Sequence, residues 1–349
     1  MCILFLSAKY MSKERPLLQP NELSDDAKVS MRKRVIFALI GIFIVLPFII
    51  FGDWAFFALI VVVLALAIIE IIHCAKTKYS KVLYIVSFIL AFLILLRNMI
   101  NDIPLMINGT WRLFESYNEL SLSVTVLFVS ICLLSVTVLI DKNFTIIDAG
   151  FIFTSVALIS LGVVSFMFLR FYPVYVYHDI LHVGESIPYF NLYDNLESFF
   201  FIFYMALGAC LNDAFAYFVG VFFGKHKMNP RISPKKTWEG FFGGVILAGL
   251  SLCGMAFAFS ANGHPLLVGL LDLEHWYHIV FLSFLIPLVS TLGDLFFSSV
   301  KRHYEIKDFS NLIPGHGGLL DRLDSLMFAA ITMSIYVSIF TESGGNFLP

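Results

Sequence analysis

Long apolar runs constrain the fold of this chain more than any other sequence feature. A helix needs about 20 consecutive apolar residues to cross roughly 30 Å of hydrocarbon. Nine runs approach or reach that length: 35–51, 54–74, 82–97, 121–140, 146–171, 197–222, 241–260, 277–293 and 325–340. The last two are short for a span. The pattern predicts an all-α, polytopic integral membrane protein with about nine transmembrane helices.

The composition argues against an ordinary soluble protein. Of the 349 residues, 59% are hydrophobic and 14% are charged, whereas soluble domains average about 25% charged residues. The net charge of −2 identifies no partner, and we expect no nucleic acid to bind. The five cysteines are far apart, without the spacing of a zinc site.

Lysine and arginine gather in alternate loops and so indicate an orientation. Short cytoplasmic loops of membrane proteins carry an excess of these residues. They precede the first run and recur in segments 76–81, 225–236 and 301–322, but are absent from 173–196 and 261–276. The alternation places the N-terminus and the most basic loops in the cytoplasm. We expect a bacterial plasma membrane, with the endoplasmic reticulum as the alternative.

The first of three polar clusters lies inside the sixth apolar run. Asn212 and Asp213 are followed by Tyr217 and Gly220. Spacings of four and seven place Asp213, Tyr217 and Gly220 on one helix face. A polar helix–helix contact would explain these residues, but a charged group inside a span costs ~2.5–3.5 kcal/mol. The ionisable Asp213 therefore favours a functional site.

The second cluster extends from Gly224 to Gly244. Ser233 and Pro234 resemble the N-cap and first residue of a helix, whose free N–H groups would attract an anion. Lys235 and Lys236 add positive charge. The pattern predicts a phosphate-binding segment at the cytoplasmic membrane surface. Ordinary positive-inside charge, or attraction to anionic lipid, is the alternative.

The third cluster extends from Gly293 to Ser325. Asp294 lies at the end of the eighth run, and Asp321 and Asp324 share a face at the start of the ninth. Three carboxylates at one boundary repel each other unless a cation neutralises them. Mg²⁺ prefers oxygen ligands and commonly pairs one or two carboxylates with substrate phosphates.

A glycine-rich turn and basic residues complete the third cluster. The glycines of segment 314–318 allow a close approach of the backbone to a ligand. Lys301, Arg302, Lys307 and Arg322 supply positive charge. Carboxylates, basic side chains and such a turn together suit phosphoryl or nucleotidyl transfer.

The third cluster resembles the signature of the phosphatidate cytidylyltransferases, also called CDP-diacylglycerol synthases. The matching residues are Ser299, Lys301, Arg302, Lys307, Asp308, Pro314, Gly315, His316, Gly317, Gly318, Asp321, Arg322 and Asp324. Segments 233–240 and 212–220 are similar to two further motifs of this family. The resemblance covers about 197–340, while the first four runs match only in hydropathy.

The resemblance implies a reaction, ligands and site residues. CTP and phosphatidic acid would give CDP-diacylglycerol and pyrophosphate, in phospholipid biosynthesis. Asp294, Asp321 and Asp324 would bind Mg²⁺, with a second cation such as K⁺ alongside, and Lys301 and Arg302 would act in catalysis with them. The expected substrate-binding residues are Asp213, Ser233, Lys235, Lys236, Lys307, Asp308, His316, Gly317, Gly318 and Arg322.

Hydropathy and these clusters together divide the chain into four parts. They are a mobile cytoplasmic tail (1–30), N-terminal membrane helices (31–190), a catalytic membrane region (191–340) with cytoplasmic loops 224–240 and 294–324, and a C-terminal tail (341–349). The expected partners are CTP, phosphatidic acid and membrane lipid, with a homodimer as the expected assembly. The alternatives are another CTP-dependent enzyme, such as a CDP-archaeol synthase or a polyprenol kinase, or an anion transporter.

Overall fold

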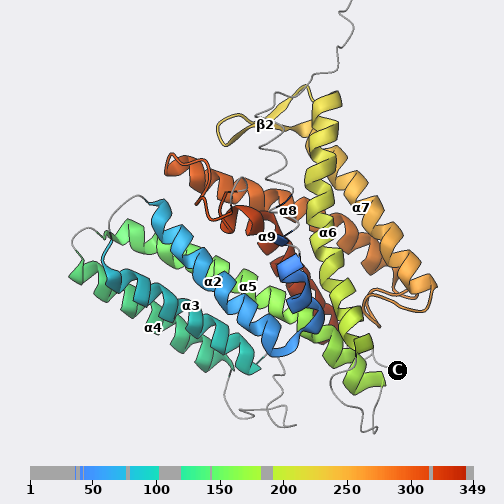
Figure 1. Ribbon diagram of the computed structural model, residues 1–349, viewed down its shortest axis with the longest axis horizontal. Coiled ribbons are helices and arrows are strands. Elements are labelled where there is room, and N and C mark those ends of the chain that lie inside the picture. Colours follow the sequence, from blue (N-terminus) through green and yellow to red (C-terminus); the bar gives the residue numbers. More distant parts are fainter. Residues whose placement is uncertain are drawn as a thin grey trace, which may run out of the picture.

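A computed structural model describes most of the chain (Figure 1). The described residues are 36, 40–41, 43–75, 79–101, 119–141, 144–181, 192–313 and 317–342. The predicted N-terminal tail, most of the C-terminal tail and His316 lie outside them.

Helices make up nearly all of the described structure. They are α2 (Asp53–Cys74), α3 (Lys81–Asn101), α4 (Glu119–Ile140), α5 (Ile146–Leu181), α6 (Leu192–Phe223), α7 (Trp238–Ala261), α8 (Trp276–His303) and α9 (Leu320–Glu342). Residues 43–51 are helical as well, and Gly52, with φ +67°, precedes α2.

The all-α polytopic fold is confirmed. Among the described residues, six helices are long and apolar enough to cross a membrane: α2, α5, α6, α7, α8 and α9. Helices α3 and α4 contribute shorter apolar stretches, 81–96 and 125–140. A total of nine spans stays a prediction.

Helix α8 is longer than its apolar run. It continues past residue 293 to His303, because the following residues contain no helix breaker and its last turn carries Lys301, Arg302 and His303. Basic side chains at that position complement the negative end of the helix dipole. Asp294 therefore lies within α8 and not at its end, and the predicted loop 294–324 shortens to residues 304–319.

A short β-hairpin connects α6 to α7. Strand β1 (Lys227–Asn229) pairs antiparallel with β2 (Ser233–Thr237). The helix start predicted at Ser233 is therefore wrong: Thr237 is the N-cap of α7, and its side-chain oxygen accepts a hydrogen bond from the backbone three residues on (3.2 Å). Pro234 is compatible with this strand because a two-stranded ribbon consists of edges only.

The helices pack as two groups joined through α5, α6 and α9. In Figure 1, α2 to α5 lie on one side of the molecule and α6 and α7 on the other, with α8 and α9 between them. Helix α5 contacts α2, α3, α6 and α9, while α6 packs along α7 and α8. Large apolar side chains remain on the outside, among them Phe43, Leu139 and Phe222. Such a surface fits contact with lipid.

Candidate active site

Small residues bring α6 and α7 close together next to the hairpin. A Cβ atom added at Gly240 would lie 2.7 Å from the carbonyl oxygen of Ala216. One added at Gly244 would lie 2.8 Å from the Ala216 Cβ atom. Membrane helices commonly use small residues for such approaches, and this seam fixes α6 against the start of α7.

Polar side chains fix α6 against α8 at the same level. The buried Asn212 amide donates hydrogen bonds to Thr291 Oγ1 (2.8 Å) and Ser290 Oγ (3.3 Å). Its neighbour Asp213 lies within electrostatic reach of Asp294 and Lys236. Tyr217, which was predicted to share the face of Asp213, is 67% exposed.

Asp294 connects α8 to the hairpin. Its Oδ2 atom forms an ion pair with Lys236 Nζ at 2.5 Å, and its Oδ1 atom accepts a hydrogen bond from Ser298 Oγ at 3.2 Å. The preceding Gly293 allows α9 to approach, since a Cβ atom there would lie 2.6 Å from the Asp324 carbonyl oxygen.

Asp213, Asp294 and Asp324 form what we call the carboxylate cluster. Asp324 interacts electrostatically with both of the other carboxylates and with Lys301. The three side chains come from α6, α8 and α9. Residues that are far apart in the sequence thus come together, but the set differs from the predicted magnesium ligands, because Asp213 takes the place of Asp321.

Lys301 lies between two carboxylates of α9. Its side chain is buried, with Nζ 2.7 Å from Asp321 Oδ1 and 3.9 Å from Asp324 Oδ2. It also lies 5.4 Å from the centre of the Phe309 ring. Burial strengthens these interactions, because water does not screen them.

Asp321 holds the loop between α8 and α9. Its Oδ2 atom accepts hydrogen bonds from the backbone N–H groups of Phe309 (2.8 Å) and Gly318 (2.9 Å). Gly317, with φ +85°, adopts a conformation that favours glycine. Since His316 lies outside the described residues, its predicted role stays a prediction.

Arg302 links the two basic segments. Its guanidinium donates hydrogen bonds to the carbonyl oxygens of Ile232 (3.3 Å) and Ile306 (3.1 Å). It thereby holds the tip of the hairpin against the end of α8. Among the other predicted substrate-binding residues, Ser233 is half-buried on β2, and the exposed ones are Lys235, Lys307, Asp308 and Arg322.

The predicted magnesium ligands do not form one compact group. Within the described part of the chain, no three His, Cys, Asp or Glu side chains have the geometry to hold a metal ion. Asp321 is engaged by Lys301 and the loop, whereas Asp213 lies near Asp294 and Asp324. The cluster still fits Mg²⁺, which needs only one or two carboxylates when phosphates complete its coordination.

One buried carboxylate near the site was missed by the sequence analysis. Glu70 of α2 accepts hydrogen bonds from Ser310 Oγ, Leu319 N and Leu320 N. The signal was present, because Glu70 is the one acidic residue in the run 54–74. It was not recognised because its partners lie some 240 to 250 residues away in the sequence.

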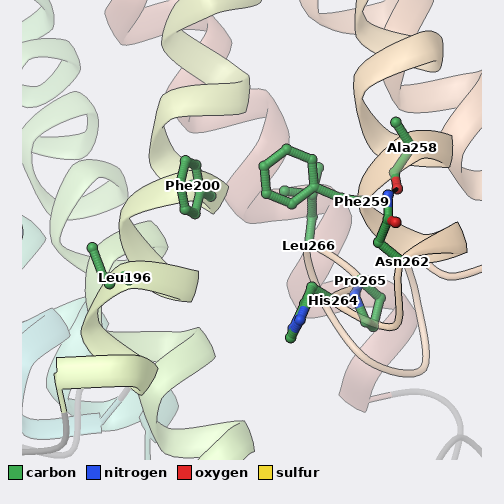
Figure 2. A pocket seen from close by; sticks show the side chains of 8 residues that line it. All are labelled: Leu196, Phe200, Ala258, Phe259, Asn262, His264, Pro265 and Leu266. Carbon is green, nitrogen blue, oxygen red and sulfur yellow. Dashed lines mark hydrogen bonds between the residues drawn. The ribbon is translucent and has the colours of Figure 1, made fainter.

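A pocket of about 410 Å³ lies at the opposite ends of α6 and α7 from the hairpin. Figure 2 shows Leu196 and Phe200 of α6 facing the end of α7 and the following loop. Its lining is largely apolar and contains none of the predicted site residues. It is therefore no candidate for binding a nucleotide.

Known proteins resemble this chain over almost its whole length. A family model described as "Cytidylyltransferase family" matches residues 32–340. The phosphatidate cytidylyltransferase of Bacillus subtilis (strain 168) is 29% identical over 315 residues, which cover 90% of this chain and 100% of the relative. That of Staphylococcus haemolyticus (strain JCSC1435) is 30% identical over 305 residues, covering 87% and 98%.

Proposed function

The chain belongs to the cytidylyltransferase family, and we propose that it makes CDP-diacylglycerol and pyrophosphate from CTP and phosphatidate. The two relatives, which match this chain over 100% and 98% of their own length, are both named for this activity. The observation that carries the site assignment is the Lys236–Asp294 ion pair of 2.5 Å. This ion pair joins the basic hairpin to the carboxylate cluster. Positive groups that can bind phosphate therefore lie next to carboxylates that can bind a metal ion.

The reaction has to bring two polyanions together. A phosphate oxygen of phosphatidate attacks the α-phosphorus of CTP, the bond from that phosphorus to the β-phosphate oxygen breaks, and pyrophosphate leaves. A phosphomonoester carries about −1.5 to −2 charges at pH 7, so a strong general base is not required. Lys236 and Lys301 would orient and neutralise the phosphates, which stabilises the charge that develops on the leaving group.

Mg²⁺ would supply further neutralisation of the phosphates and polarise the reacting phosphoryl group. We assign its binding to Asp294 and Asp324, with Asp213 nearby. Asp321 has the additional task of holding the loop, because its Oδ1 atom accepts a hydrogen bond from Lys301 and its Oδ2 atom accepts two from backbone N–H groups. A second cation such as K⁺, and assembly as a homodimer, stay predictions.

The site would lie at the cytoplasmic membrane surface, where CTP is available and acyl chains can remain in lipid. The hairpin follows α6, and the loop follows α8, which comes two helices later in the chain. Both segments carry the positive charge typical of cytoplasmic segments. The polar groups gather at this end of the helices. That distribution supports surface chemistry over an anion transporter, which needs a polar path across the bilayer.

The activity is tested with purified protein in detergent, labelled CTP, Mg²⁺ and a panel of lipids. We expect a CDP-lipid and one pyrophosphate for each CTP consumed when phosphatidate is present. A diether lipid phosphate is the control for a CDP-archaeol synthase, and a polyprenol is the control for a kinase. Product from either of these lipids with none from phosphatidate would contradict the proposal.

A further inference from the structure

Glu70 joins the N-terminal helices to the loop between α8 and α9. It lies in the last part of α2 and is 4% exposed. Its Oε1 atom accepts hydrogen bonds from Ser310 Oγ (2.6 Å) and Leu319 N (2.8 Å), and its Oε2 atom accepts one from Leu320 N (2.7 Å). A buried carboxylate is costly unless hydrogen bonds compensate it, and these three donors do so.

The position of Glu70 suits the start of α9. The first N–H groups of a helix have no partner within the helix, and a negative charge there interacts favourably with the helix dipole. Gly318 of the glycine-rich turn is fitted to the same carboxylate, because a Cβ atom at this position would lie 2.7 Å from Glu70 Oε2. Any larger residue at position 318 would displace Glu70.

Glu70 and Asp321 bind adjacent residues at both ends of the same loop. Asp321 accepts hydrogen bonds from the N–H groups of Phe309 and Gly318. Glu70 accepts hydrogen bonds from the next residue in each case, Ser310 and Leu319. Since Asp321 is also paired with Lys301, the loop held by Glu70 is directly connected to the charged groups of the site.

We propose that Glu70 is a positioning residue for CTP binding: it fixes residues 309–310 and 317–320, so that Asp321 keeps the Lys301 side chain in place to meet the nucleotide phosphates. It touches neither substrate and acts through the loop. This inference rests on the proposed function, and it gives the N-terminal membrane helices a role in the reaction. Those helices contributed no residue to the site predicted from the sequence.

The first test measures loop order without any substrate. Hydrogen–deuterium exchange in detergent compares the parent with Glu70→Gln. This substitution replaces one carboxylate oxygen by an NH₂ group, which cannot accept the hydrogen bonds that Ser310, Leu319 and Leu320 donate. Asp148→Asn is the matched control, because Asp148 also accepts hydrogen bonds at a helix start, from Thr145 at the beginning of α5. We expect faster exchange of residues 309–320 in Glu70→Gln only, with α7 unchanged. Unchanged exchange of this segment, or faster exchange throughout the protein, would overturn the proposal.

The second test is kinetic. Because misplaced binding groups cost roughly 10- to 100-fold, we expect Glu70→Gln to lower kcat/KM for CTP by that factor, mainly through KM, with KM for phosphatidate nearly unchanged. Ser310→Ala removes one of the three donors and should have a smaller effect that is not additive with Glu70→Gln. An equal rise in both KM values, or a fall in kcat alone, would contradict a role in positioning the CTP loop.

The two tests separate this inference from the proposed function. If the parent protein makes no CDP-lipid, the proposed function fails, whereas the exchange measurement still decides whether Glu70 orders the loop. If the parent is active and Glu70→Gln matches it in both measurements, the proposed function stands and the role of Glu70 is refuted.

Discussion

Neighbouring residues of the hairpin have different roles because successive side chains of a strand point to opposite faces. Lys235 is exposed, whereas Lys236 is half-buried and pairs with Asp294. Both lysines were expected to bind substrate, because the sequence pattern placed them in the first turn of a helix. Once the segment is a strand, only one of them can face the carboxylate cluster.

Lys236→Met should therefore reduce activity far more than Lys235→Met. Loss of a group that stabilises developing charge costs roughly 100-fold or more, and it also leaves Asp294 without its partner. We expect Lys235→Met to change the activity by no more than about threefold, because interactions of an exposed charge are weak. Initial rates over a range of CTP concentrations test this, and equal losses in the two variants would refute the assignment.

Gly293 offers a second test at the level of single residues. An added Cβ atom would lie 2.6 Å from a backbone oxygen of α9, whereas one at Gly254 of α7 meets nothing within 4 Å. Forcing extra volume into a packed contact costs about 1–3 kcal/mol. Gly293→Ala should thus lower the melting temperature in detergent and the activity, and Gly254→Ala should change neither. Tolerance of both substitutions would argue against the close approach of α8 and α9 at Asp294.

At the scale of elements, hydropathy predicted where the helices lie, because lipid requires each spanning segment to satisfy its own backbone. It did not predict where they end. Helix α8 extends into polar sequence because nothing in residues 294–303 stops it, and its polar end carries Asp294 and Lys301. The hairpin was missed because Ser233 and Pro234 match the local pattern of a helix start, while the true cap is Thr237.

The two candidate caps make opposite predictions for stability. Loss of an N-cap hydroxyl costs about 1 kcal/mol, so Thr237→Val should lower the melting temperature in detergent by removing the bond to Gly240. Ser233→Ala should have little effect on the melting temperature, because Ser233 lies on β2. The reverse result would restore the helix start that the sequence suggested.

At the scale of the whole molecule, the charged motifs of the C-terminal half were recognisable from their spacing, but their partners were not. Spacing indicated that Asp321 and Asp324 share a face of α9. It could not show that Lys301 separates Asp321 from the carboxylate cluster. Nor could it connect Glu70 of α2 to the start of α9, because contacts between distant segments depend on the packing of all the helices.

The proposed orientation predicts that the start of α7 faces the cytoplasm and that its end faces the opposite side of the membrane. In a background without native cysteines, Lys235→Cys should react with a membrane-impermeant reagent only from the cytoplasmic side. Asn262→Cys, at the other end of α7, should react only from the opposite side. Labelling of Lys235→Cys from outside intact cells would contradict a cytoplasmic site.

A comparison of Asp294→Asn with Asp272→Asn tests whether cytidylyl transfer depends on the carboxylate cluster. Asp272 also accepts backbone hydrogen bonds, from Gly269 and His275, but it precedes the opposite end of α8. With labelled CTP, phosphatidate and Mg²⁺, we expect the Asp272 variant to make CDP-diacylglycerol like the parent and the folded Asp294 variant to lose roughly 100-fold or more. Equal product from the Asp294 variant and the parent would show that the reaction does not depend on this cluster.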